Sequence, residues 1–197
     1  VGTAEFWGSV GTSLGRILAG FFSATVAGVI FAALSARFSA VRSALAPFVQ
    51  AVKAAPVASF VILVLIWVPS RHLSIIISFL MVFPIIYTNV LKGIAQTDAQ
   101  LLEMARVFDV RPWRRITHIY VSQALAYFQA GCALALGLCW KSGIAAEVIG
   151  LPANSIGEHL YEAKVYLDTP DLFAWTLVII VISLMFEKVF NAALNAA

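Results

Sequence analysis

The sequence predicts an all-α protein, a polytopic transmembrane bundle of about five spanning helices that forms one domain over residues 1–197. The first observation is composition: 61% of the residues are hydrophobic and only 12% are charged, about half the charged share of a typical soluble domain. The second is length, because several apolar stretches reach the roughly 20 residues that a helix needs to cross a bilayer. The third is a single long polar interruption at residues 98–122.

Five stretches account for the expected crossings. They are residues 14–36, 47–68, 73–94, 123–140 and 172–186. Pro56 interrupts the second, so this helix is expected to be kinked or to enter the membrane obliquely. Pro84 lies inside the third, where neighbouring helices can bond the backbone groups that it frees. Residues 141–170 mix apolar and acidic residues and are expected to form an outer loop.

Residues 98–122, called here the docking segment, are too highly charged to lie in hydrocarbon. Their charged residues are Asp98, Glu103, Arg106, Asp109, Arg111, Arg114 and Arg115. The positive-inside rule places the docking segment in the cytoplasm, because its side of the predicted topology collects nine of the 13 lysines and arginines. These nine are Arg37, Arg42, Lys53, Lys92, Arg106, Arg111, Arg114, Arg115 and Lys188. The N-terminus is then outside and the C-terminus inside.

Three tryptophans agree with this orientation. Trp67, Trp140 and Trp175 all fall at the predicted outer boundary, as an aromatic belt would require. The chain starts at Val1 without a methionine and without a signal-peptide pattern, so we expect its N-terminus to be processed or truncated.

The docking segment is expected to contain an amphipathic helix, a bend and a second helix. At helical spacing, one face of its first half carries Leu101, Met104, Ala105 and Phe108. Glu103 and Arg106 are expected to pair at i, i+3 on the other face. Pro112 suits the first turn of the second helix, with the bend near Asp109. The alternative interpretation is an ordinary basic loop.

No group of residues predicts catalysis, a metal site or a cofactor. Cys132 and Cys139 lie seven residues apart on one face of an apolar helix, which favours two small buried side chains over a disulfide or a metal site. The three histidines are scattered and have no ligand spacing. Residues 137–142 come near the phosphate-binding pattern G-x-x-x-x-G-K-[ST] but in the wrong order, so no nucleotide site is expected. The sequence therefore does not predict an enzyme.

Four polar residues are candidates for lining a path through the membrane. They are Lys53, Thr88, Asn89 and Glu147. Each has an alternative role: Lys53 can extend its amine to the lipid surface, Thr88 and Asn89 can bond a neighbouring helix, and Glu147 can be a solvated residue of the outer loop.

Residues 103–109 and 119–122 resemble the E-A-A-x-x-x-G-x(9)-I-x-L-P loop of bacterial ABC importer permeases. The matching residues are Glu103, Ala105 and Ile119, with Val121 a conservative match. The departing residues are Met104, Asp109 and Ser122. Asp109 is among the few residue types that tolerate a left-handed backbone in place of glycine, and Ser122 can cap the following helix in place of proline.

The resemblance extends along most of the chain. The nitrate/taurine/sulfonate branch of the family is similar at these residues: Ser13, Leu14, Arg16, Leu18, Gly20, Phe21, Ala46, Pro47, Lys53, Pro56, Phe83, Pro84, Gly93, Ala146, Glu147, Ile156 and Gly157. It implies a type I importer fold in a bacterial inner membrane, with a second permease copy, cytoplasmic ABC ATPases and an extracytoplasmic substrate-binding protein as partners, and no nucleic acid. The substrate would be a small nitrate, sulfonate, taurine or vitamin-precursor solute.

In this family the docking segment couples the permease to the ATPase. The residues that the resemblance assigns to this contact are Leu101, Leu102, Glu103, Met104, Ala105, Arg106, Phe108 and Asp109. An ion-gradient-driven secondary transporter and a non-transporting membrane scaffold subunit are the alternative functions. The lack of a visible inverted repeat weakens the first of them.

Overall fold

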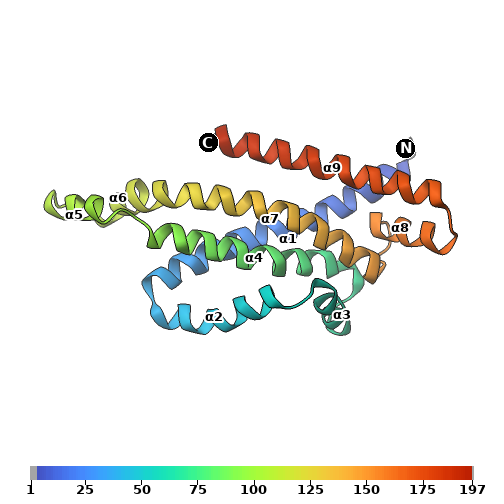
Figure 1. The fold of residues 1–197 in the computed structure, drawn as a ribbon, viewed down its shortest axis with the longest axis horizontal. Helices are drawn as coiled ribbons and strands as arrows, with labels where there is room; N and C mark the ends of the chain where they lie inside the picture. Colours follow the sequence, from blue (N-terminus) through green and yellow to red (C-terminus); the bar gives the residue numbers. More distant parts are fainter. Residues whose placement is uncertain (1–3, 197) are drawn as a thin grey trace.

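The chain folds into a long helical bundle (Figure 1), and the computed structural model describes residues 4–196. Its helical elements, in chain order, are α1 (Ala4–Arg37), α2 (Ser39–Ala54), α3 (Val57–Trp67), α4 (Ser70–Ala95), α5 (Ala99–Val107), α6 (Pro112–Arg115), the π-helical turn η1 (Ile116–Tyr120), α7 (Val121–Gly150), α8 (Ile156–Val165) and α9 (Thr169–Ala196). No strand occurs among these described residues. The predicted all-α fold class is confirmed.

Within residues 4–196, four helical stretches are long and apolar enough to cross a membrane alone, and the bent pair α2 and α3 makes a fifth crossing if it is one span. In Figure 1, α1, α4 and α9 run in one direction along the bundle, while α2 and α7 run in the other. This alternation is what successive membrane crossings require.

The core of the bundle is the packing of α4 against α1 on one side and α7 on the other. Gly20 of α1 lies against α4 so closely that an added Cβ would stand 2.5 Å from the carbonyl oxygen of Ile75. In hydrocarbon, helices associate by such close packing of small residues rather than by the hydrophobic effect. The residues buried between these helices include Ile17, Phe21, Val82, Ile86, Cys132, Leu136 and Cys139. Both cysteines are buried and free, as predicted.

The second predicted span is broken, as expected from Pro56. Helices α2 and α3 meet at an angle of 111° at the break between Ala54 and Val57. Pro56 has extended backbone angles and no N–H to continue the α2 ladder. Lys53 therefore lies in the last turn of α2, just before the chain turns.

The fourth span is longer than predicted, and the expected outer loop is mostly helical. Residues 141–150 continue α7 to Gly150, and α8 follows after five residues. Glu147 does not end the helix because its carboxylate is hydrogen-bonded inside the protein. Helix α7 ends at Gly150, and its C-cap Leu151 has a left-handed φ of 46°. Pro152 follows, as is common after a helix C-terminus.

Two of the three tryptophans do not form the predicted aromatic belt. Trp140 and Trp175 are only 4% and 8% exposed and pack inside the protein, whereas a belt residue faces the membrane boundary. Trp67 is 82% exposed at the end of α3 and remains compatible with that role. Trp140 and Trp175 are buried because neighbouring helices pack against them, and the sequence does not reveal those neighbours.

Candidate functional site

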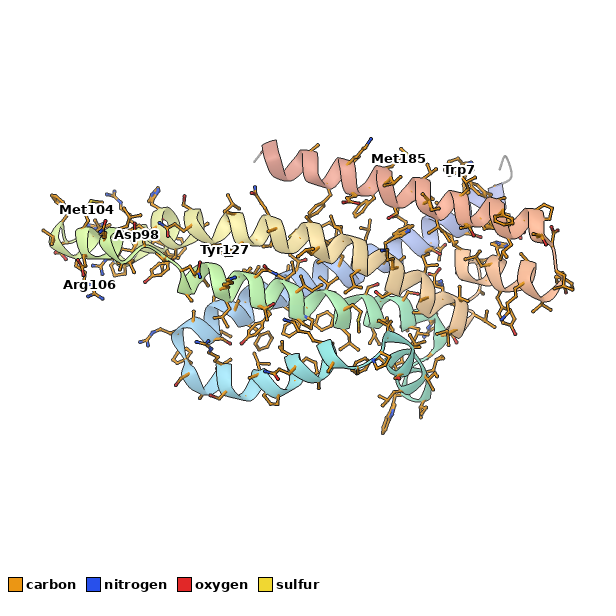
Figure 2. The ribbon with its side chains drawn as sticks, in the orientation of Figure 1. Trp7, Asp98, Met104, Arg106, Tyr127 and Met185 are labelled. Atoms are coloured by element: carbon orange, nitrogen blue, oxygen red, sulfur yellow. The ribbon has the colours of Figure 1, made fainter. Side chains whose placement is uncertain are left out.

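The docking segment projects beyond one end of the bundle, where Figure 2 labels Met104 and Arg106 on α5, far from the labelled Trp7 of α1. Helix α5 begins at an N-cap, because a side-chain oxygen of Asp98 accepts a hydrogen bond of 2.8 Å from the backbone N–H of Gln100. Such a cap satisfies one of the free donors at a helix start. The projection is therefore an ordered helix rather than an irregular basic loop.

The chain reverses at Asp109, as predicted, and Asp109 has a left-handed φ of 47°. The backbone N–H of Val110 donates to the carbonyl of Ala105 at 2.9 Å and closes the end of α5. Pro112 then starts α6, also as predicted. Residues 106–109 and 111–114, on either side of this turn, are exposed.

Apolar side chains are exposed around this turn. Val107 is 81% exposed and Phe108 is 75% exposed, and Met104 and Trp113 are also exposed. Ala105, by contrast, is 1% exposed, so the predicted apolar face is divided between an inward and an outward side. An exposed apolar cluster of this kind is typical of a contact with another protein or with a membrane surface.

Two details of the predicted docking segment differ in the structure. Glu103 and Arg106 are both exposed, and no ion pair joins them. Val107 and Trp113 were not among the predicted contact residues, although they are among the most exposed apolar side chains of the segment. Their position on either side of the bend was the signal that could have identified them.

The docking segment is fastened to α7. The backbone N–H of Asp98 donates a hydrogen bond of 2.8 Å to the side-chain carbonyl of Gln123. Just before the segment, the side-chain carbonyl of Gln96 accepts a hydrogen bond of 2.5 Å from the hydroxyl of Tyr127. Residues 112–150 form one continuous helical stretch through α6, η1 and α7. Ser122 therefore lies inside this stretch and is not the helix cap that its position suggested. A displacement of the tip would be carried directly into a spanning helix.

The backbone at Asp109 allows a specific prediction. Replacing Asp109 with valine should lower the thermal midpoint of the purified protein by several degrees, because a β-branched residue is strongly disfavoured at positive φ. Replacing it with glycine, which adopts this conformation freely, should leave the midpoint unchanged or raise it. Thermal unfolding in detergent compares the two, and equal midpoints for valine and glycine would contradict the assigned backbone.

Two of the four predicted pathway residues meet in one cavity of about 480 Å³ between α2 and α4. The amine of Lys53 donates to the hydroxyl of Thr88 at 3.2 Å. The Thr88 hydroxyl in turn donates to the carbonyl of Pro84, one turn earlier on α4, at 2.7 Å. Gln50 also lines the cavity. The Lys53 amine thus points to α4, not away to the lipid surface.

Asn89 lies elsewhere, at the contact of α4 with α7. Its side-chain amide donates to the carbonyl of Ile85 at 2.9 Å, and it packs on Gly131, where an added Cβ would stand 3.0 Å from the Cβ of Asn89. Asn89 therefore serves helix packing in this structure.

Glu147 is fully buried in the last turn of α7, and this end of α7 lies at the opposite end of the bundle from the docking segment (Figure 1). The hydroxyls of Ser13 and Ser74 donate to its two carboxylate oxygens at 2.6 Å and 3.2 Å. The guanidinium of Arg16 lies 3.9 Å away, and the backbone N–H of Gly157 donates at 3.4 Å. These partners belong to α1, α4 and α8. The alternative role of Glu147 as a solvated outer-loop residue does not hold, because the side chain is fully buried and hydrogen-bonded on several sides. Its role in lining a path stays a prediction.

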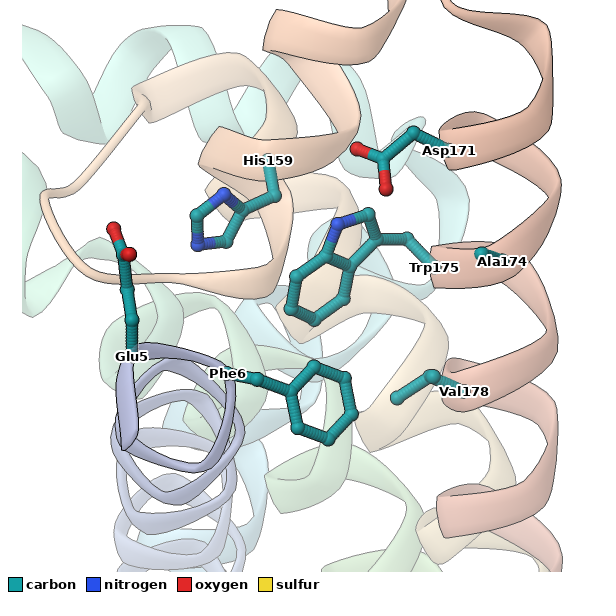
Figure 3. Close-up of a pocket in the computed structure, with 7 residues that line it drawn as sticks. All are labelled: Glu5, Phe6, His159, Asp171, Ala174, Trp175 and Val178. Carbon is teal, nitrogen blue, oxygen red and sulfur yellow. The ribbon is translucent and has the colours of Figure 1, made fainter. Parts of the chain in front are cut away.

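A second cavity, of about 270 Å³, opens at this same end among α1, α8 and α9 (Figure 3). The His159 ring stacks on the Trp175 ring with centroids 4.7 Å apart, and the centroid of the Phe6 ring lies 5.1 Å from that of Trp175. Glu5 and Asp171 also line this cavity. Among residues 4–196, no group of three or more His, Cys, Asp or Glu side chains is placed to hold a metal ion.

Comparison with known proteins identifies the family. The family described as "Binding-protein-dependent transport system inner membrane component" matches residues 24–195. A protein named as an aliphatic sulfonates transport permease, SsuC of Bacillus subtilis (strain 168), is 25% identical over 91% of this chain, and the chain spans 65% of its length. The taurine transport system permease protein TauC of Escherichia coli (strain K12) is 23% identical over 93% of this chain and is 67% covered.

Two further relatives extend this comparison. The bicarbonate transport system permease protein CmpB of Synechocystis sp. (strain ATCC 27184 / PCC 6803 / Kazusa) is 28% identical over 80% of this chain and is 56% covered. The crystal structure of an amino acid ABC transporter with histidines has the same fold, with a TM-score of 0.68, 15% identity and coverage of 98% of this chain and 91% of that chain. The relatives SsuC, TauC and CmpB are named as transport permeases, not as enzymes. The chain belongs to the family of inner membrane components of binding-protein-dependent transport systems.

Proposed function

We propose that this chain is a transmembrane permease subunit of an ATP-driven importer, and that the docking segment is its contact with a cytoplasmic ABC ATPase. The observation that carries the proposal is the exposed apolar tip of α5, with Val107 and Phe108 uncovered beyond the end of the bundle. A helix that presents apolar side chains can seat them in a groove of a partner protein. Because α6 continues into α7, rigid movement of that partner would reach the membrane.

The docking segment would lie in the cytoplasm, with the start of α1 outside and the end of α9 inside. The charge count supports this orientation, because nine of the 13 lysines and arginines fall on the side of the docking segment. The opposite end, where α8 and the cavity of Figure 3 lie, would then face the extracytoplasmic binding protein that delivers the solute.

The working assembly would contain two permease copies, two ATPases and one binding protein. Much of α9 and α3 is exposed in the single chain, including Ile66 of α3 and Leu177 of α9. Such surfaces suit either lipid or a second copy of the chain. The names of the relatives, which include sulfonate, taurine and bicarbonate permeases, support a small solute as substrate.

The proposal predicts a loss of coupling in Glu103→Lys. Glu103 is exposed and forms no ion pair in the described part of the chain, so its reversal should leave folding unchanged but place a wrong charge in the ATPase contact. We expect co-purification with the cognate ATPase and ATP-dependent solute uptake in proteoliposomes to fall at least tenfold, as expected when like charges meet in an interface.

The control is Asp171→Lys, the same reversal on an exposed carboxylate at the other end of the molecule, which should co-purify with the ATPase like the parent protein. If Glu103→Lys also retained ATPase binding and uptake, the coupling role would be wrong. Solute uptake by proteoliposomes that contain the permease without any ATPase would instead support an ion-driven transporter. A bundle that binds the ATPase but supports no uptake under any condition would indicate a scaffold.

A further inference from the structure

The charge of the first half of the chain is one-sided. Between Glu5 and Asp98 the sequence contains no aspartate or glutamate. The basic residues in the same stretch are Arg16, Arg37, Arg42, Lys53, Arg71 and Lys92. Helices α2, α3 and α4 therefore present cations and neutral polar groups but no carboxylate. Cations that line a cavity without a carboxylate partner are able to bind an anion by charge-assisted hydrogen bonds.

Two of these cations line the cavity between α2 and α4. Arg42 and Lys53 are both among its lining residues, with Gln50 and Thr88 as neutral hydrogen-bonding groups. Neither cation forms an ion pair with a carboxylate in residues 4–196. The cavity thus holds two positive charges that the protein does not neutralise, together with an amide and a hydroxyl that can donate hydrogen bonds.

Another cavity, of about 260 Å³ and separate from that of Figure 3, adjoins the cavity between α2 and α4 on the side of the docking segment. These two adjoining cavities are called here the first and the second. Arg42 and Leu91 line both cavities. The hydroxyl of Tyr87, a lining residue of the first, donates to the hydroxyl of Ser35, a lining residue of the second, at 3.1 Å. The buried hydroxyl of Thr97 in the second cavity has no hydrogen-bond partner among the described residues. Within that same part of the chain, no acidic residue lines either cavity.

We infer that these two cavities form a binding site for a small soluble oxyanion, such as a sulfonate, on the inner part of the transport pathway, with Lys53 and Arg42 as its charge-selecting residues. This inference rests on the proposed transport function and adds the charge of the solute and the residues that select it. An oxyanion would accept hydrogen bonds from the Lys53 amine, the Arg42 guanidinium and the Gln50 amide. The cavity of Figure 3 does not suit the same ligand, because Glu5 and Asp171 line it.

The test measures electrostatic selection at a cysteine placed in the cavity of the whole chain. Gln50→Cys puts a thiol three residues from Lys53 on α2, and the protein is reconstituted in nanodiscs of zwitterionic phosphatidylcholine. Its reaction with a sulfonate-bearing methanethiosulfonate is compared with that of a trimethylammonium methanethiosulfonate. The parent protein, which keeps Gln50, gives the background from Cys132 and Cys139, which are buried.

We expect the anionic reagent to react about tenfold faster than the cationic one, because neighbours at i, i+3 lie close enough for one charge to change the local concentration by this factor. Adding Lys53→Gln should remove this preference, while Lys53→Arg should retain it. The matched control is Lys92→Gln, which removes an exposed lysine of α4 that lines neither cavity and should leave the preference intact.

An unchanged preference in Lys53→Gln would overturn the inference. So would a preference that nanodiscs with anionic phosphatidylglycerol reduce to the level of Lys53→Gln, because lipid headgroups would then be the occupant. A preference that survives phosphatidylglycerol supports a soluble anion. No ATPase is present in this experiment, so its outcome is independent of that of Glu103→Lys.

Discussion

Replacing Glu147 with alanine is expected to lower the free energy of unfolding by about 3–5 kcal/mol, the effect of removing one partner of a buried ion pair. The change would leave the hydroxyls of Ser13 and Ser74 without their acceptor. It would also leave Arg16 without its carboxylate partner. Because these partners come from α1 and α4, both helices should loosen from the end of α7 together.

Chemical unfolding in mixed micelles measures this effect. The control is Glu158→Ala on α8, where the carboxylate is partly exposed and accepts one hydrogen bond of 2.7 Å from the N–H of Asn154. That change should lower the free energy by about 1 kcal/mol or less, the usual contribution of one hydrogen bond. An effect of Glu147→Ala no larger than the control would show that the carboxylate does not hold these helices together.

Replacing Phe108 with alanine is expected to weaken binding of the cognate ATPase by about 30- to 700-fold, equivalent to the 2–4 kcal/mol of an aromatic residue at the centre of an interface. Phe108 is 75% exposed at the bend of the docking segment. Its ring has no partner ring within the described residues to hold it in the free subunit. Truncation should therefore affect the complex far more than the isolated permease.

The affinity of the permease in nanodiscs for the purified ATPase measures this loss. The control is Phe173→Ala, which removes a phenylalanine that is also well exposed but lies near the start of α9, and α9 begins at the opposite end of the molecule (Figure 1). It should bind the ATPase as the parent protein does. If Phe108→Ala bound equally well, the tip of α5 would not be the central contact.

Most of the spanning helices could be predicted from the sequence, because a bilayer imposes one requirement that composition reveals. A stretch of about 20 apolar residues must be a helix there, since its backbone has no other way to be satisfied. The break at Pro56 and the bend at Asp109 could also be predicted, because a proline and a residue that tolerates a left-handed conformation each act on their own backbone. Such local constraints need no knowledge of neighbouring helices.

The partners of individual polar residues could not be predicted in this way. Thr88 and Asn89 are adjacent in the sequence, yet one lines the cavity with Lys53 and the other packs on Gly131 of α7. Successive residues on a helix point in directions about 100° apart, so adjacent residues face different neighbours. Which neighbour each one meets depends on how α4 sits between its flanking helices.

The sequence by itself determined that this chain is a membrane bundle with one projecting polar segment, because hydrophobicity and charge decide which residues enter hydrocarbon. Only the tertiary structure decided that Glu147 is buried among four helices and that Arg42 and Lys53 share an acid-free cavity. The physical reason is that whether a charged residue is solvated or buried depends on partners contributed by distant parts of the chain. Ser13, which lies 134 residues from Glu147 in the sequence, is such a partner.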